Sequence, residues 1–285
     1  MENSTKGNLM LLLTASIWGL AFVAQSAGMH YVGPFTFQFI ASSIGVLVLL
    51  PLIAYRKGKV QYDDSKLLKS GLIVGVIFFA ASNFQQVGVC YTTAGKAGFL
   101  TAMYILIVPL IESFSGKKLS GRMWLCIAMA VVGLYFLCVN EDFSISIGDL
   151  LCLICGLLFA LHIMAIDKCG AGVDGVKLSA IQFGINALLT GIIALAVEKP
   201  TLGAIQDAWL PLLYAGAMSR GVAYTLQIIG QKYTDPVIAS LIMSLESVFA
   251  VIGGFLLLQE YISFKELIGL LLMFGSIMLS QLKKE

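Results

Sequence analysis

The sequence predicts an all-α integral membrane protein of about ten transmembrane helices, arranged as two inverted five-helix repeats. Three observations predict this fold: an apolar composition, ten apolar stretches of spanning length, and a similarity between the two halves of the chain. Of the 285 residues, 59% are hydrophobic and 12% are charged, whereas soluble domains usually carry about 25% charged residues. So few charged groups cannot cover a surface in water, and lipid is therefore the expected solvent.

The apolar stretches have the length that a bilayer requires. A hydrocarbon core about 30 Å thick needs about 20 helical residues, because each residue adds about 1.5 Å. Little chain remains between the spans, so no separate soluble domain is expected. The first span is interpreted as a helix rather than a signal peptide, since its apolar run is long for one. The predicted spans are roughly 8–28, 34–55, 69–90, 95–114, 122–139, 147–166, 178–197, 207–230, 235–258 and 265–282.

Positive charge is distributed unevenly among the loops. With the N-terminus inside, the inner loops and tails hold fourteen Lys and Arg residues and the outer loops hold only Lys199 and Lys265. Cytoplasmic loops are typically rich in Lys and Arg, so both termini are expected in the cytoplasm and the number of spans should be even. Short loops favour a bacterial inner membrane. The net charge of +2 then reflects topology and does not indicate nucleic-acid binding.

The two halves of the chain resemble each other at a shift of 142 residues. YTTAGKAGFLTAMY begins at Tyr91, and YTDPVIASLIMSLE begins at Tyr233. We therefore expect two repeats, residues 1–142 and 143–285. Because each holds an odd number of spans, the second must cross the membrane in the opposite direction. Inverted repeats are typical of secondary transporters, with a substrate site near the midplane.

Four segments carry a resemblance to a known family. They are IWGLAFVAQ from Ile17, QQVGVCYTTAGKAGFLTAMYILIVPL from Gln85, DGVKLSAIQF from Asp174, and GVAYTLQIIGQKYTDPVIASLIMSLESVFAVIGGFLLLQE from Gly221. These segments resemble the EamA family of the drug/metabolite transporter (DMT) superfamily, over nearly the whole chain. The resemblance implies two inverted five-helix repeats, a central cavity, and movement of small metabolites, often amino-acid export.

Two charged residues in the middle of predicted spans indicate where a site would lie. A charge at the centre of a membrane helix costs about 2.5–3.5 kcal/mol on insertion scales, so it needs a partner or a water-filled cavity. Glu246 and Arg220 each lie 13 residues from Tyr233 (246 − 233 and 233 − 220), which places them at equal depth. We predict an ion pair between them that faces the cavity. In the alternative, Glu246 is protonated and hydrogen-bonded, and Arg220 reaches water.

The remaining candidates are polar or aromatic residues within spans. The 142-residue shift sets Tyr104 opposite Glu246, so the two can bind opposite ends of one substrate. Helical spacing puts Arg220, Tyr224 and Gln227 on one face. For the polar members, hydrogen bonds between helices are the alternative role. The candidate substrate-binding residues are Trp18, Asn83, Gln86, Tyr104, Arg220, Tyr224, Gln227 and Glu246.

Proton coupling has two candidate groups, Glu246 and His162. Burial can raise the pKa of a carboxyl group, and histidine titrates near neutral pH; a packing role is the alternative for His162. Cys152 and Cys155 have metal-like spacing, but no second Cys or His pair accompanies them. They are interpreted as packing residues, so no metal and no cofactor are expected.

Together these features favour a secondary transporter that works by alternating access, with a small-molecule substrate and the lipid bilayer as partners. Family resemblance favours an amino acid or a similar small polar metabolite as cargo, moved by export. A non-transporting sensor or structural protein is one alternative. An integral-membrane enzyme is a weaker one, because the chain has only two histidines, His30 and His162, and dispersed carboxylates. Oligomeric state is left open.

Overall fold

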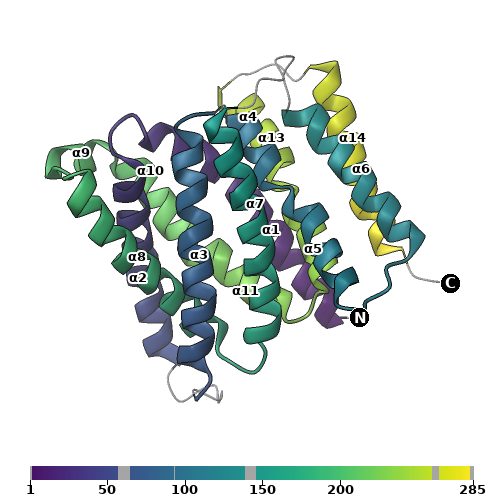
Figure 1. Cartoon of the computed structure of the whole chain (residues 1–285), viewed down its shortest axis with the longest axis horizontal. Helices are drawn as coiled ribbons and strands as arrows, with labels where there is room; N and C mark the ends of the chain where they lie inside the picture. Colours follow the sequence, from purple (N-terminus) through teal and green to yellow (C-terminus); the bar gives the residue numbers. More distant parts are fainter. Residues whose placement is uncertain (1, 57–64, 93, 139–145, 259–262, 283–285) are drawn as a thin grey trace.

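A computed structural model describes residues 2–56, 65–92, 94–138, 146–258 and 263–282, and every secondary-structure element in these ranges is helical. The elements form a bundle of elongated helices that run roughly side by side (Figure 1). In chain order they are α1 (Glu2–Gly28), α2 (Pro34–Arg56), α3 (Leu67–Val89), α4 (Ala94–Thr101), α5 (Tyr104–Phe114), α6 (Gly121–Cys138), α7 (Ile147–Cys169), α8 (Gly175–Val197), α9 (Leu202–Asp207), α10 (Trp209–Leu213), η1 (Tyr214–Tyr224), α11 (Thr225–Gln231), α12 (Pro236–Met243), α13 (Glu246–Leu258) and α14 (Phe264–Gln281).

Six helical stretches in the described ranges are long and apolar enough to cross a membrane, and shorter apolar helices cover 121–136 and 236–252. The prediction of an all-helical membrane fold is confirmed for these ranges, and the number of ten spans stays a prediction. The six stretches are Asn3–Gly28, Pro34–Arg56, Leu67–Val89, Ala97–Phe114, Ile147–Cys169 and Gly175–Val197.

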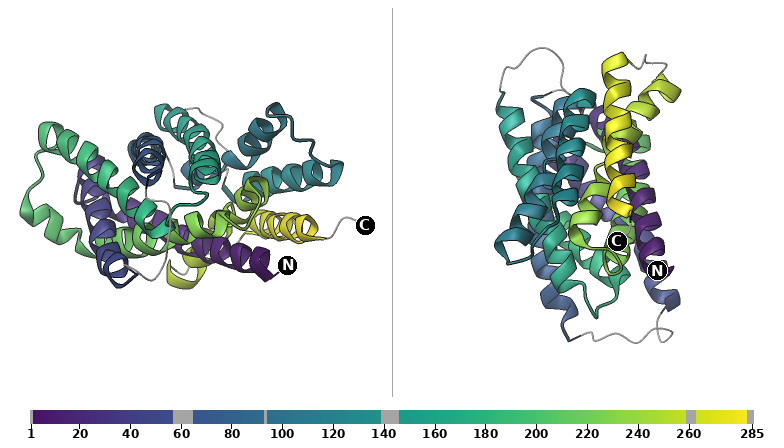
Figure 2. Two further views of the ribbon diagram at one scale, coloured as in Figure 1. Left: turned by 90° about the horizontal axis from the view of Figure 1, so that it is seen from below. Right: turned by 90° about the vertical axis from the view of Figure 1, so that its right-hand side faces the viewer.

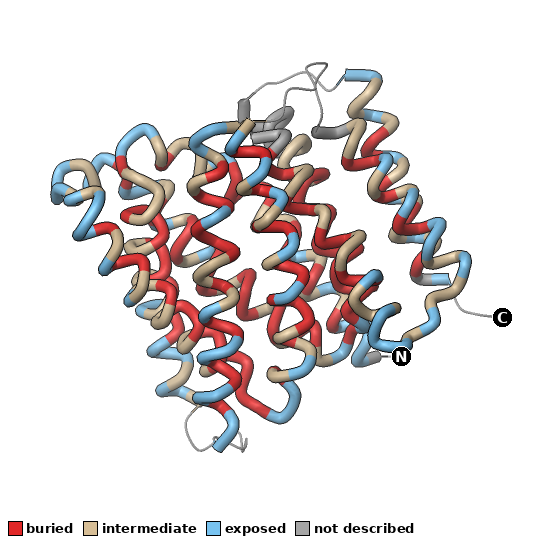
Figure 3. Tube along the Cα trace, in the orientation of Figure 1, coloured by how far each residue is buried: buried red, intermediate tan, exposed pale blue. Residues whose placement is uncertain are grey.

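Exposed leucines and isoleucines cover the outer faces of the bundle. Figure 3 shows buried residues along the inward-facing side of the central helices and exposed residues outside. On α8, Leu188, Ile192 and Leu195 are each at least 60% exposed, and they follow helical spacing. A stripe of this kind is unfavourable in water but suits contact with lipid chains.

Helices from the two halves of the chain interleave. The most extensive packing joins α2 with α8, α3 with α7, and α6 with α14, and α1 packs along α13. Figures 1 and 2 show α6 and α14 side by side at one edge of the bundle. The start of α1 and the end of α14 lie at the same end of the bundle, here called the terminal face (Figure 2).

The fourth span of each half is broken at the same point. The first break, at Ala102 and Met103, separates α4 from α5, and the second, at Ser244 and Leu245, separates α12 from α13. Equivalent tight turns close the two breaks, because Met103 N donates to Leu100 O at 3.3 Å and Leu245 N donates to Ile242 O at 3.2 Å. The breaks are 142 residues apart (244 − 102), which is the shift of the sequence repeat.

The eighth predicted span contains a long π-helix, η1. π-Helices are rare and frequently occur at functional sites. Two hydrogen bonds of 3.0 Å join it to α1: Tyr214 Oη donates to Ile17 O, and Thr14 Oγ1 donates to Ala223 O. α1 packs against η1, α11, α12 and α13. A helix of the first half therefore packs among four helices of the second half.

Helices α2 and α8 are joined near both ends. Glu198, the C-cap of α8, accepts hydrogen bonds from the backbone N–H groups of Phe35 at 2.9 Å and Thr36 at 2.7 Å, in the first turn of α2. A carboxylate at this position satisfies free N–H groups and interacts favourably with the helix dipole. At the other end, Arg56 of α2 pairs with Asp174, the N-cap of α8, at 3.5 Å.

Candidate functional site

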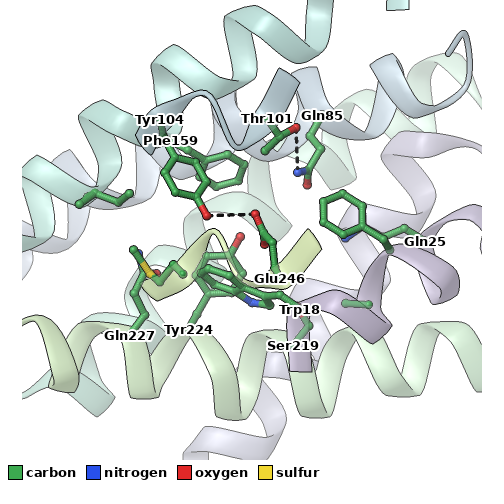
Figure 4. Close-up of a pocket in the computed structure, with 14 residues that line it drawn as sticks. Trp18, Gln25, Gln85, Thr101, Tyr104, Phe159, Ser219, Tyr224, Gln227 and Glu246 are labelled. Carbon is green, nitrogen blue, oxygen red and sulfur yellow. Dashed lines mark hydrogen bonds between the residues drawn. The ribbon is translucent and has the colours of Figure 1, made fainter. Parts of the chain in front are cut away.

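A cavity with about 440 Å³ of empty volume, part of it open to the outside, lies between helices of both halves. On α1 it is lined by the second half of the helix, from Trp18 to Gln25, away from the terminal face. Figure 4 shows its polar and aromatic side chains converging from opposite walls. The lining residues are Trp18, Ala21, Phe22, Gln25, Gln85, Thr101, Tyr104, Phe159, Ile163, Ser219, Tyr224, Gln227, Met243 and Glu246.

Much of the lining consists of repeat-related residues. Eight of the fourteen lining residues form pairs separated by the 142-residue shift, with one member from each half of the chain. The cavity is therefore lined by equivalent positions of the two halves of the chain. The four pairs are Ala21 and Ile163, Gln85 and Gln227, Thr101 and Met243, and Tyr104 and Glu246.

Tyr104 and Glu246 meet in the middle of this cavity. Tyr104 Oη donates a hydrogen bond of 3.0 Å to Glu246 Oε1, and the side chains are 3% and 4% exposed. Each is the first residue of its helix after the break. The two breaks therefore bring the ends of α5 and α13 together at the cavity. The position of Glu246 in the first turn of α13 also favours a negative charge there.

Three other predicted residues line the cavity as well: Trp18, Tyr224 and Gln227. The rings of Trp18 and Tyr224 lie 4.5 Å apart between centroids. Two of these side chains carry a buried polar atom without a hydrogen-bond partner, Trp18 Nε1 and Gln227 Oε1. Gln25 Oε1 is a third such atom in the lining. Unpaired buried polar groups are unfavourable, so these atoms are available for a bound molecule.

The predicted ion pair between Arg220 and Glu246 is wrong. Arg220 faces α2 and donates to Gln38 Oε1, to Ser42 Oγ at 3.0 Å and to Ala215 O at 3.2 Å. Glu246 instead accepts from Tyr104. Equal depth in the membrane did not bring Arg220 and Glu246 together, because α1 packs against both of the helices that carry them, η1 and α13. In the wider turn of η1, the residues that share the cavity face are Ser219 and Tyr224, five apart.

Asn83 and Gln86 also lie outside the lining, in a buried polar network with Arg220. Gln38 Nε2 donates to Gln86 Oε1 at 3.2 Å, and Asn83 Nδ2 donates to Asn186 Oδ1 at 3.2 Å. Asn186 Nδ2 in turn donates to Ser42 Oγ at 2.6 Å. The network connects α2, α3, α8 and η1, which is the helix-joining role that polar residues often have in membranes.

His162 lies behind the cavity wall. Its Nε2 is 3.0 Å from Gln182 Oε1, and its ring is 6.2 Å from that of Tyr224. The side chain is fully buried and does not line the cavity. Cys152 and Cys155 are buried as well. Within the described ranges, no group of three or more His, Cys, Asp and Glu residues is arranged to hold a metal ion.

Several lining residues were not among the predicted site residues. Gln85 and Thr101 form a long hydrogen bond of 3.5 Å in the cavity wall. A signal for Gln85 was present, because the repeat pairs it with Gln227. Ser219 carried no such signal, since an α-helical face through Tyr224 and Gln227 excludes it, whereas the π-helix includes it. Gln25 lies on α1 two turns after Trp18, on the same face of the helix. Trp18 alone therefore points to Gln25 only if the cavity is at least two helical turns long.

Comparison with known proteins decides the family. The model of the EamA-like transporter family matches residues 5–139 and again residues 146–282. The chain belongs to this family. It is similar to a protein of Archaeoglobus fulgidus described as an uncharacterized transporter, with 30% identity over 97% of this chain and 86% of the relative. It is also 22% identical to the uncharacterized transporter YoaV of Bacillus subtilis, over 93% of this chain and 92% of that protein.

The fold is shared with solved structures. One, titled only "Crystal structure of protein", aligns with a TM-score of 0.81 and 18% identity, covering 97% of this chain and 96% of the other. The predicted EamA membership is confirmed, and with it the DMT superfamily. Members of the family are transporters, so this chain is a multi-pass membrane protein of the transporter class that acts on small molecules.

Proposed function

We propose that the chain is a secondary transporter that carries a small polar metabolite through the central cavity by alternating access. The observation that carries this proposal is the buried Tyr104–Glu246 pair, which lies at the meeting point of the two repeats and lines the cavity. A carboxyl group there can bind a polar cargo from either side once the cavity changes its opening. The repeats are residues 1–142 and 143–285, and ten spans are proposed.

The cavity offers binding groups for the ammonium end of an amino-acid-like cargo. Glu246 and the phenol of Tyr104 suit an ammonium group, which donates hydrogen bonds and is attracted to a negative charge. Arg220 does not face the cavity for a carboxylate end, because each of its three guanidinium nitrogens donates to Gln38, Ser42 or Ala215. The amino group is therefore the part of the cargo whose binding the cavity supports better. Export is proposed as the direction of transport on the ground of the family resemblance.

Transport in purified vesicles tests the function. Proteoliposomes that contain the protein and a mixture of amines and amino acids should lose selected compounds faster than protein-free liposomes do. Mass spectrometry of the external buffer measures which compounds leave. A compound that binds the protein tightly but never crosses the membrane would instead support a sensor.

The orientation is proposed from the loop charges, and the structure is compatible with it. The start of α1 and the end of α14 lie at the terminal face (Figure 2), as an even number of crossings requires. We place this face in the cytoplasm, with the protein in the cell (inner) membrane. Epitope tags fused to the two ends should both survive protease added to intact spheroplasts, and loss of either tag would contradict the orientation.

A polar latch holds the two repeats together at the terminal face. Lys117, in the link between α5 and α6, pairs with Glu112 at 2.7 Å and with Asp235, the N-cap of α12. Burial lowers the pKa of Lys117, but hydrogen bonds to Asp235 and Glu112 raise it further, so that the net pKa lies above the usual lysine value. The cation therefore persists through neutral pH, and the latch has to break before the cavity opens on this side.

Replacement of Lys117 with Met is expected to loosen this face. Partly exposed ion pairs contribute about 0.2–1 kcal/mol each, so amide hydrogen exchange in α12 (Pro236–Met243) should become about two- to fivefold faster. Lys118→Met is the matched control, because Lys118 is exposed on the same link. Equal exchange in both variants would show that Lys117 does not hold the face closed.

A further inference from the structure

The ionisable lining of the cavity is acidic and not basic. Among the fourteen lining residues, all of which belong to the described part of the chain, Glu246 is the one acidic residue and none is Lys, Arg or His. Arg220 is 4% exposed and donates to three neutral acceptors in the network behind the wall. A buried charge needs a partner, so an ionised Glu246 favours a cation as the bound species. A carboxylate on the cargo would find no positive partner in the lining.

The walls around Glu246 are aromatic. Trp18, Phe22, Tyr104, Phe159 and Tyr224 all line the cavity. Figure 4 shows the rings of Trp18 and Tyr224 on one side of Glu246 and those of Tyr104 and Phe159 on the other. The faces of aromatic rings attract ammonium groups, including that of lysine, and each such cation–π contact contributes about 0.5–2 kcal/mol, with the higher value where water is excluded. This lining suits a positive charge with an apolar body.

The unpaired polar atoms point to the same class of cargo. Gln25 Oε1 and Gln227 Oε1 are acceptors without partners, and Gln227 is 1% exposed. Together with the Glu246 carboxylate, they give the lining several acceptors, which suits a cargo that donates hydrogen bonds. Among the fully buried polar atoms of the described lining, Trp18 Nε1 is the donor without a partner, and it suits a neutral acceptor on the cargo, such as a hydroxyl group.

From these features we propose that the cavity selects small organic ammonium ions that lack a carboxylate, and disfavours the corresponding amino acids. The ammonium group pairs with Glu246, the carbon skeleton packs among the rings, and the Gln oxygens are acceptors for further donor groups of the cargo. This inference rests on the proposed transport function and narrows its cargo. Alkylamines suit it because they are protonated at neutral pH, as the lysine side chain is.

Matched pairs of compounds that differ by one carboxylate test the inference. The pairs are 2-phenylethylamine with phenylalanine and 3-methylbutylamine with leucine, and phenylalaninol adds a hydroxyl group to the first amine. Isothermal titration calorimetry on the full-length protein in detergent should give each amine a Kd at least about tenfold lower than its amino acid, the loss expected for one unpaired buried charge. Phenylalaninol should bind at least as tightly as 2-phenylethylamine.

Variants show whether the binding uses this cavity. In Glu246→Gln the preference for the amine should disappear, whereas Asp207→Asn, on the exposed end of α9, should keep it. Equal or tighter binding of the amino acids overturns the inference but leaves transport standing if those amino acids cross proteoliposomes. Amine binding that Glu246→Gln leaves unchanged overturns it as well. If no compound of a broad metabolite mixture crosses the vesicles, the proposed transport itself is wrong.

Discussion

Glu246→Gln is expected to reduce transport about ten- to a hundredfold while leaving the fold intact. Hydrogen bonds to charged groups contribute about 1.5–3 kcal/mol, and each 1.4 kcal/mol is a tenfold change. Glutamine has nearly the same shape and keeps an oxygen that can accept from Tyr104 Oη, whose bond to Glu246 is 3.0 Å. The substitution therefore removes the carboxyl group of the cavity, with its capacity for negative charge, and little else. Initial rates of cargo loss from proteoliposomes measure the effect.

Tyr104→Phe separates the charge from the hydrogen bond. A neutral hydrogen bond contributes about 0.5–1.5 kcal/mol, so this variant should lose about two- to tenfold. Asp207→Asn is the control for removing a carboxylate elsewhere, because Asp207 is exposed. A larger loss in Tyr104→Phe than in Glu246→Gln would show that the phenol, and not the charge, binds the cargo. Unchanged transport in both would remove this pair from the site.

Arg220→Ser is expected to destabilise the protein without weakening cargo binding. The change leaves the acceptors of Gln38, Ser42 and Ala215 without their donor, and each unsatisfied buried group costs about 1–3 kcal/mol. Because Asn186 still donates to Ser42 Oγ, two groups are left unsatisfied, and a total loss of about 2–6 kcal/mol should lower the apparent Tm in detergent by about 4–24 °C, on the scale of larger domains. The Kd of the cargo, measured well below the Tm, should stay within about threefold of the parent.

Arg56→Ser is the matched control for that variant. Arg56 is an arginine whose side chain is 27% exposed and pairs with Asp174 at 3.5 Å, and such pairs contribute about 0–1 kcal/mol. Its Tm should therefore fall much less than that of Arg220→Ser. A higher Kd for the cargo in Arg220→Ser, together with an unchanged Tm, would show that Arg220 contributes to cargo binding after all.

The ends of several helices were predictable because local residues determine them. Pro34 begins α2, as expected for proline in the first turn, and Arg56 ends it within one residue of the prediction. Asp235 and Pro236 start α12 in the same way. The interruptions at Ala102–Met103 and Ser244–Leu245 were not predictable, because neither pair contains Gly or Pro. Tertiary contacts decide where these two spans break.

The site was predicted in part, for an identifiable reason. Pairing Tyr104 with Glu246 used the repeat alone, which does not depend on the shape of any helix, and the structure joins these residues. Pairing Arg220 with Glu246 assumed regular α-helices with a constant rise and a direct contact between two spans. The π-helix η1 and the position of α1 remove both assumptions. Neither the spacing of apolar residues nor the helix propensity of single residues distinguishes this π-helix from an α-helix.

The double connection between α2 and α8 restricts how the molecule can move. Glu198 at one end and the Arg56–Asp174 pair at the other fasten a helix from each half to its counterpart. In the proposed transport cycle we therefore expect the units that shift to differ from the two halves of the chain, because a motion of one half against the other would break both connections. Each rigid body would then be a composite drawn from both halves, with mechanical coupling across the duplication through α2 and α8.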